Sequence, residues 1–322
     1  MKREHWLNLL RIAISLGLLA WVFSRVGIAQ VLEVARGASP GLLAVSGLLS
    51  VFGILLRAWR WQVLLRAIGA RPPFARLVYL YFVSQFFSSF LPTGFAGDVV
   101  RVLDTGHGVS STQAAGTVIV ERLAGFVSLF LLALAALPFA GGLVPPAWVL
   151  GIAGLSLAVV AGSLVLFEGR LLRKATAWLP GGLSLTSGSW LAQTYDVVVA
   201  CGARAILSAL GIATVFNIVQ IAFNLALARA LGIEAHALYF ALFIPVATVA
   251  LLVPISISGL GVREQIYVTL FASPAVGLAA PQAVALSLGA YGLDTLNGLV
   301  GGVMYFVAGA FGLRGKKIER VC

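Results

Sequence analysis

Long runs of apolar residues, separated by short polar segments, dominate the pattern along this chain. Six runs are long enough to cross the roughly 30 Å hydrocarbon core of a bilayer as α-helices. They are 7–24, 41–57, 113–139, 147–167, 205–231 and 282–311. Two further apolar stretches, 77–105 and 237–273, are interrupted by proline and glycine. The pattern predicts an all-α, polytopic helical membrane protein with about six full spans.

Each interrupted stretch runs from a turn directly into charge. The turn residues are Pro92, Gly94 and Gly97 in the first stretch, and Pro254, Gly259 and Gly261 in the second. A broken backbone and a charge are both costly in lipid, so they are tolerated mainly where they line a protein cavity. One such break in each half of the chain predicts a transport or lipid-handling site at a repeat interface.

Clusters of basic residues predict which loops are cytoplasmic. They occur at Lys2-Arg3, in 57–76, in 168–204 and in the tail from Arg314. For 57–76 and the start of the span 113–139 both to be cytoplasmic, 77–105 must enter the membrane and return. By the same parity, 237–273 enters from outside. We predict two re-entrant helical hairpins in an inverted pseudo-repeat, with both termini cytoplasmic; the alternative is eight tilted full spans.

The chain is predicted to form a single integral domain over 1–322 in the plasma (inner) membrane. Its first half covers about 1–167 and its second half about 205–311, joined by an interfacial linker, 168–204. An amphipathic pattern over 170–178 indicates a helix lying on the membrane surface. Trp59 and Trp61, beside basic residues, are typical of the membrane interface.

Composition narrows the class of protein and of partner. The chain is 60% hydrophobic and 10% charged, which no ordinary soluble domain matches. The net charge is +11, and most of the basic residues cluster between the apolar spans. This distribution favours anionic lipid headgroups as partners over nucleic acid. Cys201 and Cys322 form no disulfide or metal pattern, and the histidines are isolated. We therefore expect no metal and no cofactor.

Seven charged residues fall at predicted membrane depth: Asp98, Arg101, Glu121, Arg122, Arg263, Glu264 and Asp294. Asp98 and Arg101 are spaced i, i+3 and can pair on one helix face. Glu121 and Arg122 are adjacent, so their side chains point about 100° apart and need different partners. Two interpretations remain: the charges pair structurally and lock the hairpins into the bundle, or some line a hydrated cavity for a polar headgroup.

Two polar stripes are consistent with an internal cavity. Asn217, Gln220 and Asn224 share one face of the span 205–231. The last span carries Ser287, Tyr291, Asp294, Asn297 and Gly298, and its glycines at 298, 301 and 302 permit close helix approach. The alternative is that these polar groups only connect neighbouring helices.

The glycine-rich turns precede helix starts, where free N–H groups favour phosphate. Arg101 and Arg263 lie within the first turn or two of these helices, which suggests a phospholipid-phosphate site. The alternative is that the glycines merely allow a tight turn. Asp294 is the acidic residue that we rank first for the site, with Arg122 or Arg263 as its expected partner.

As a set, these motifs resemble the lysylphosphatidylglycerol synthase transmembrane-region family, including its stand-alone flippase-like members. The motifs are Arg57-x-x-Arg-Trp61, the run at 90–101, Glu121-Arg122, Ser258-Gly-Leu-Gly-x-Arg-Glu264 and Asp294. The resemblance implies that this region moves a lipid across the bilayer, while a separate soluble domain performs aminoacyl transfer. Because the sequence ends at Cys322, we expect no synthase activity.

We therefore expect a flippase-like transporter that is not an enzyme. Arg101 and Arg263 would hold the lipid phosphate, while Asp98, Glu121, Glu264 and Asp294 balance charge or contact a cationic headgroup. One alternative is a membrane-embedded lipid-modifying transferase. Another is a non-catalytic partner of a lipid-synthesis complex, with an enzyme of that pathway as its protein partner.

Overall fold

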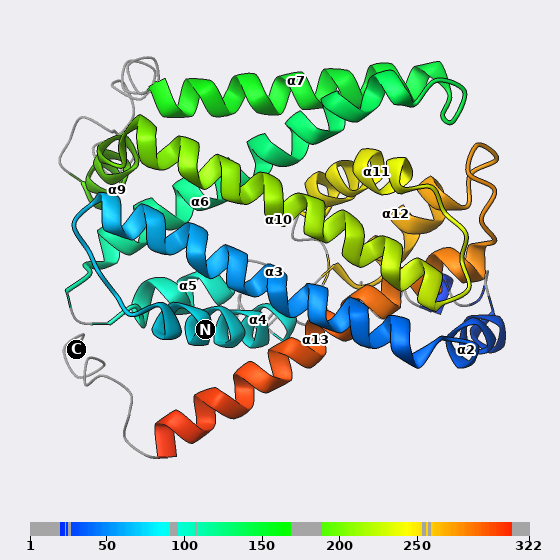
Figure 1. Ribbon diagram of the computed structural model, residues 1–322, viewed down its shortest axis with the longest axis horizontal. Helices are drawn as coiled ribbons and strands as arrows, with labels where there is room; N and C mark the ends of the chain where they lie inside the picture. Colours follow the sequence, from blue (N-terminus) through cyan, green and yellow to red (C-terminus); the bar gives the residue numbers. More distant parts are fainter. Residues whose placement is uncertain are drawn as a thin grey trace, which may run out of the picture.

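The computed structural model describes residues 20–22, 24, 27–90, 96–106, 108–168, 189–252, 256 and 259–310. Within these ranges it contains helices and no strands, which confirms the predicted all-α class (Figure 1). The helices are α2 (Ile28–Arg36), α3 (Pro40–Ala67), α4 (Phe74–Phe90), α5 (Ala96–Leu103), α6 (Ser111–Ala136), η1 (Leu137–Phe139), α7 (Pro146–Glu168), α9 (Trp190–Ala200), α10 (Gly202–Ala230), α11 (Ala237–Ala250), α12 (Val262–Phe271) and α13 (Ala280–Ala310).

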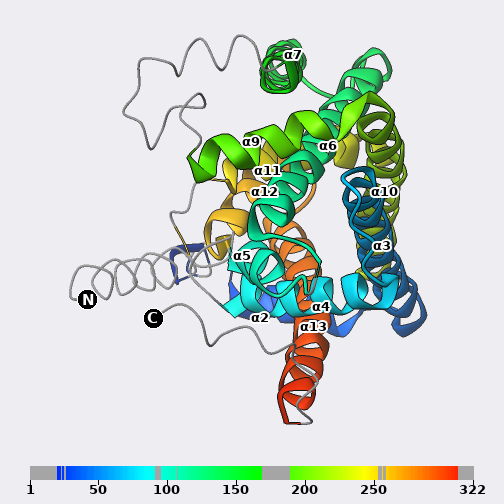
Figure 2. The same cartoon turned by 90° about the vertical axis from the view of Figure 1, so that its left-hand side faces the viewer.

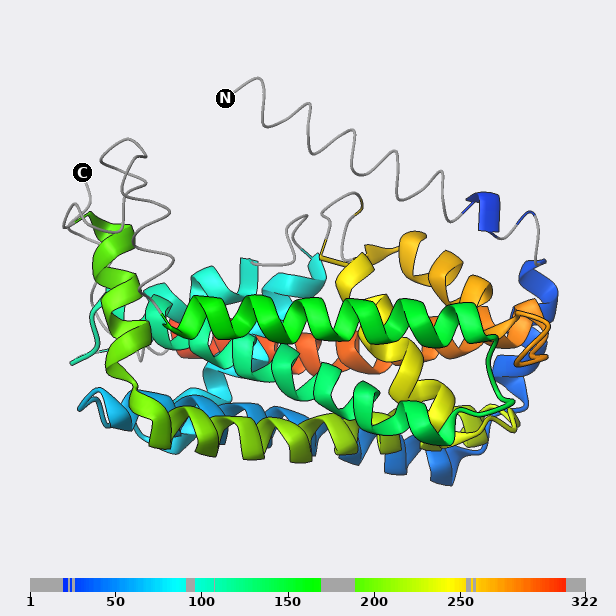
Figure 3. The same cartoon turned by 90° about the horizontal axis from the view of Figure 1, so that it is seen from above.

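Five described helices are long and apolar enough to cross a membrane: α3, α6 continued by η1, α7, α10 and α13. They correspond to five of the six predicted spans; the remaining span, 7–24, falls almost entirely outside the described residues. The long helices lie roughly along one axis of the molecule (Figures 1 and 3). Viewed nearly end-on, α7 lies at the periphery of the bundle (Figure 2). Its exposed leucines, such as Leu157, suit contact with lipid.

Local sequence signals set the ends of several helices. α3 begins with Pro40 directly after Ser39, a position where proline is favourable because its missing N–H would have no intrahelical partner. α6 begins with a capping box, in which the Ser110 and Gln113 side chains each accept the other residue's backbone N–H. These signals place the charged residues of α6 about three turns inside the helix.

Each interrupted stretch forms a pair of helices whose outer ends lie together. In the first pair, α4 and α5, an ion pair of 2.8 Å joins Arg76 near the start of α4 to Asp104 after α5. In the second pair, α11 and α12, the Tyr239 hydroxyl donates to the Ala275 carbonyl at 3.4 Å. The two pairs lie toward opposite ends of the bundle (Figures 1 and 3). This arrangement fits two hairpins, while their re-entrant position in the bilayer and the inverted repeat stay predictions.

The first arginine-rich segment is helical where the sequence analysis placed a loop. α3 continues to Ala67, so the predicted end of that span at residue 57 is wrong. Trp61 is fully buried, and its indole N–H donates to the Thr117 hydroxyl on α6 at 3.0 Å. The ring of Trp61 therefore packs inside the bundle, whereas Trp59 is 50% exposed, and the interfacial depth of both stays a prediction.

Glycines bring α13 into backbone contact with α4. A Cβ added at Gly301 would overlap the Phe82 carbonyl, and one added at Gly298 would lie 3.2 Å from the Phe86 Cα. A Cβ at Gly302 would lie 2.7 Å from the Phe86 ring. The predicted close helix approach at these three glycines is confirmed, and we call this contact the α4–α13 seam.

Candidate functional site

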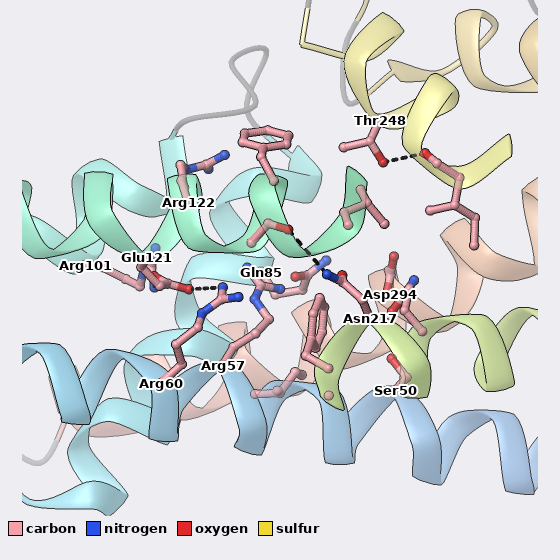
Figure 4. Close-up of a pocket in the computed structure, with 18 residues that line it drawn as sticks. Ser50, Arg57, Arg60, Gln85, Arg101, Glu121, Arg122, Asn217, Thr248 and Asp294 are labelled. Carbon is pink, nitrogen blue, oxygen red and sulfur yellow. Dashed lines mark hydrogen bonds and ion pairs between the residues drawn. The ribbon is translucent and has the colours of Figure 1, made fainter. Parts of the chain in front are cut away.

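A cavity of about 360 Å³ lies among the long helices, and its lining combines charged, polar and apolar side chains. The charged side chains are Arg57, Arg60, Arg101, Glu121, Arg122 and Asp294. Amide and hydroxyl groups are supplied by Ser50, Gln85, Asn217, Gln220 and Thr248. Figure 4 shows the labelled residues among them converging from α3, α4, α5, α6, α10, α11 and α13. A polar cavity of this kind is unusual inside a bundle whose helices are apolar.

A continuous chain of ion pairs forms one end of the cavity. Glu121 accepts from Arg60 at 2.7 Å and from Arg101 at 2.9 Å, one carboxylate oxygen for each arginine. Arg101 also pairs with Asp98 at 2.5 Å, and the other Asp98 oxygen pairs with Arg122. We call these five residues the arginine–carboxylate chain; it joins α3, α5 and α6.

The arginine–carboxylate chain contains more positive than negative charge. Three guanidinium groups share two carboxylates, and Arg60, Arg101 and Glu121 are all buried. Arg101 is further enclosed by the rings of Trp61 and Tyr81, at 4.9 and 4.3 Å from its guanidinium carbon. The surplus cation favours an anionic partner in the cavity, because an uncompensated charge is costly at this depth.

The helical period explains why α3 supplies so much of the lining. Ser50, Gly53, Arg57 and Arg60 recur at intervals of three or four residues and so share one face. Gly53 leaves room on that face for the Phe216 ring of α10, since a Cβ at position 53 would lie 3.3 Å from the ring. Arg57 lies over the ring of Tyr81 at 5.0 Å.

Two of the predicted pairing rules are confirmed. Asp98 and Arg101 do pair within one helix, and the adjacent Glu121 and Arg122 do contact different partners. Arg122 pairs with Asp98, and among the described residues no ion pair joins either expected partner, Arg122 or Arg263, to Asp294. Arg263 is one of two arginines whose charge acts on Asp294.

The second predicted turn places its charges beside the cavity rather than in its lining. Glu264 is fully buried and accepts the Gly261 N–H at 2.6 Å and the Ser287 hydroxyl at 3.0 Å. Its carboxylate therefore occupies the start of α12, where the sequence suggested phosphate. Arg263 lies over the Tyr291 ring at 5.3 Å and is not among the cavity-lining residues.

Different structural features explain why glycine occupies the predicted turn positions. Gly259 and Gly261 have φ values of 76° and 82°, which glycine adopts without strain. Gly97 is required by space, because a Cβ there would overlap the Ser84 carbonyl of α4. Pro92, Gly94 and Pro254 lie outside the described residues, as does the predicted surface helix 170–178.

The two polar stripes divide between the cavity and helix contacts. Asn217 and Gln220 line the cavity, and Asn217 also donates to the Ser128 hydroxyl of α6 at 3.1 Å. Asn224 is buried and donates to the Gln220 carbonyl at 2.8 Å. Tyr291 donates to the Ser89 carbonyl at 3.4 Å, and Asn297 donates to the Ser50 hydroxyl at 2.8 Å. Both interpretations of the stripes therefore apply, each to different residues.

Sequence reasoning missed Arg57 and Arg60 as cavity residues. They were counted with the basic loop because apolar residues become sparser after position 57. The available signal was their i, i+3 spacing on the same helix face as Ser50 and Gly53. For metals, the described part of the chain contains no group of three or more histidine, cysteine or acidic residues that could hold an ion.

A family profile described as Lysylphosphatidylglycerol synthase TM region matches residues 8–313. The chain belongs to this family. It is also similar to a protein named UPF0104 membrane protein from Methanothermobacter thermautotrophicus, at 28% identity over 100 residues. That match covers 31% of this chain and 28% of the relative. The family membership confirms the predicted resemblance and supports the assignment as an integral membrane protein.

Proposed function

We propose that this protein binds a phospholipid headgroup in the cavity and moves it between the two leaflets. The observation that carries the proposal is a cavity with four arginines, lined mainly by helices long and apolar enough to cross a membrane. Guanidinium groups match phosphate oxygens in charge and geometry. The exposed apolar faces of the same helices suit the acyl chains, which can remain in the bilayer.

In this proposal, the arginines divide the work. Glu121 and Asp98 hold Arg101 from two sides, so Arg101 serves to position its neighbours. Arg57 carries no ion pair among the described residues and lines the cavity directly, so it is the better phosphate ligand. The phosphate role expected for Arg263 stays a prediction of the sequence analysis.

The topology is part of the same proposal. The helix pairs α4–α5 and α11–α12 would be re-entrant hairpins from opposite faces of an inner membrane, with both chain termini cytoplasmic. Movement of the headgroup would be passive, coupled to an ion or dependent on a partner of the lipid-synthesis machinery. The protein would act as a transporter and not as an enzyme.

The test is transport in liposomes that contain the purified protein and a trace of acyl-chain-labelled phosphatidylglycerol. Dithionite added outside reports which leaflet holds the label. We expect redistribution with the native protein, a loss of about tenfold or more in rate with Arg57→Gln, and a normal rate with Arg66→Gln. Arg66 is an exposed arginine on the same helix and so controls for charge.

Mass spectrometry of the recovered lipid separates transport from the alternatives. Redistribution without a change in lipid mass supports the proposal. A changed lipid mass would identify a lipid-modifying transferase. If a folded protein neither redistributes nor modifies the lipid, the transport function is contradicted. That result would favour a non-catalytic partner of a synthesis complex.

A further inference from the structure

We propose that the cavity is a bipolar site that selects zwitterionic headgroups, with a phosphate subsite at Arg57 and Arg60 and an ammonium subsite at Asp294. The inference rests on the proposed function, because it names the class of lipid that the same cavity would bind. It follows from the distribution of unpaired groups around the cavity.

The phosphate subsite is indicated by donors that the protein leaves unused. Arg60 is 5% exposed, and only its Nη2 donates, to Glu121 at 2.7 Å. Its Nε and Nη1 are buried and have no hydrogen-bond acceptor among the described residues. Buried donors without an acceptor are costly, and a charged group raises that cost. An anion in the cavity would supply the missing acceptors.

Arg57 completes the phosphate subsite from the next turn of α3. It is half-buried, lines the cavity, and forms no ion pair within the described ranges. Its guanidinium carbon lies 6.0 Å from the Phe216 ring centre, and that of Arg60 lies 5.8 Å from the same ring centre. Both cations lie near one aromatic ring and on one face of α3, and both line the cavity, which favours a phosphate shared between them.

The ammonium subsite lies at the other end of the cavity. Figure 4 shows Asp294 beside Ser50, with Arg57 and Gln85 between them and the arginine–carboxylate chain. The positive charges that act on Asp294 are those of Arg263 and Arg57. Neither forms an ion pair with it in the part of the chain that the structure describes. A ligand cation would supply the direct partner that this carboxylate lacks.

A headgroup with both charges satisfies both ends at once. A purely anionic headgroup leaves Asp294 without a cation, and a cation alone leaves the arginine donors without acceptors. Selectivity then arises from the unpaired group that the wrong ligand leaves behind. The cavity volume of about 360 Å³ lies within the range of small-molecule sites.

Calorimetric titration of the detergent-purified protein tests the bipolar site with short-chain lipids. Dihexanoyl phosphatidylethanolamine carries phosphate and ammonium, while the phosphatidylglycerol and N-acetyl-phosphatidylethanolamine analogues lack the ammonium. We expect the native protein to bind the first about tenfold more tightly than either of the others. This comparison needs no substitution and therefore does not depend on the folding of a variant.

Two substitutions then assign the ends. Asp294→Asn should weaken binding of the phosphatidylethanolamine about tenfold and leave that of the phosphatidylglycerol unchanged. Arg57→Gln should weaken both about tenfold or more, and the control Arg66→Gln neither. Each variant is first checked by thermal unfolding.

Three outcomes would overturn the bipolar site. The first is equal affinity of the native protein for all three lipids. The second is an equal effect of Asp294→Asn on binding of the phosphatidylethanolamine and the phosphatidylglycerol, and the third is no effect of Arg57→Gln on binding of either. The result is independent of the liposome assay. Selective binding without redistribution would retain the bipolar site and remove the transport function. Redistribution of all lipids at one rate, with equal affinities, would retain transport and remove the bipolar site.

Discussion

At the scale of single residues, Glu121 determines how the buried charges are arranged. It is 2% exposed and accepts from two arginines on two different helices. Without the charge of Glu121, Asp98 would be the one carboxylate left in the arginine–carboxylate chain, and it pairs with Arg101 but not with Arg60. Buried ion pairs of this kind stabilise weakly when complete but are costly to break.

We expect Glu121→Gln to lower the free energy of unfolding by about 3–5 kcal/mol, because it leaves buried guanidinium charge uncompensated. Denaturant unfolding of the detergent-purified protein measures the change. The matched control is Asp104→Asn, which alters an ion pair whose side chains are 25% and 26% exposed. That change should cost about 1 kcal/mol or less. Equal losses in the two variants would contradict a central role for Glu121.

At this scale, the sequence predicts local contacts and misses distant ones. The pairing of Asp98 with Arg101 follows from their spacing alone, and so does the divergence of Glu121 and Arg122. The contact between Arg60 and Glu121 joins residues 61 positions apart, and no periodicity carries that information. Both arginines of the proposed phosphate subsite, Arg57 and Arg60, are therefore absent from the cavity that the sequence predicts, although both lie on α3.

At the scale of elements, the α4–α13 seam is the tightest helix contact that the glycines define. Three glycines within five residues of α13 face the backbone of Phe82 and the backbone and ring of Phe86. Small residues at such positions let backbones approach, which is the main source of helix association in lipid. The seam also places Asp294, less than two turns before Gly298 and Gly301, beside the cavity.

Gly301→Val should disrupt this seam, because its Cβ overlaps the Phe82 carbonyl and backbone cannot move aside cheaply. We expect loss of the monodisperse folded protein, or a reduction in stability of several kcal/mol, measured by size-exclusion chromatography and thermal unfolding. Gly292→Val on the same helix is the control, since a Cβ there meets nothing within 4 Å. A stable Gly301→Val protein would show that the two helices separate easily.

Hydropathy predicts the long helices well and their limits poorly. Five expected spans coincide with described helices because continuous apolar sequence has few alternatives in lipid. The extension of α3 to Ala67 was missed because Arg57, Arg60 and Arg66 lower the hydropathy there, although their helix continues. The side chains of the first two are accommodated by carboxylate and aromatic partners from other helices.

At the scale of the whole molecule, the outer ends of each helix pair lie together, which constrains the topology. Arg76 and Asp104 close the first pair, and Tyr239 and Ala275 close the second. A stretch that returns to its starting point adds no net crossing of the bilayer. In the proposed re-entrant topology, positive charge on the flanking loops sets the side from which each pair enters.

Cysteine labelling in intact cells checks this arrangement. Exposed positions flank each pair, so Arg71→Cys and Ser111→Cys should react only after the membrane is made permeable. Glu234→Cys and Pro274→Cys, also exposed, should react with an impermeant maleimide added outside. Reaction from opposite sides within either pair would support full spans in place of re-entrant hairpins.

The α4–α13 seam has a mechanical consequence for any transport cycle. Backbones in such close contact resist sliding past each other, so we expect α4 and α13 to move as one rigid body. Asp294 moves with that body, whereas Arg57 and Arg60 belong to α3. Rocking of the body against α3 would change the spacing between the two charged ends of the cavity. A headgroup bridging those ends would hold the two bodies together, and its release would let them part.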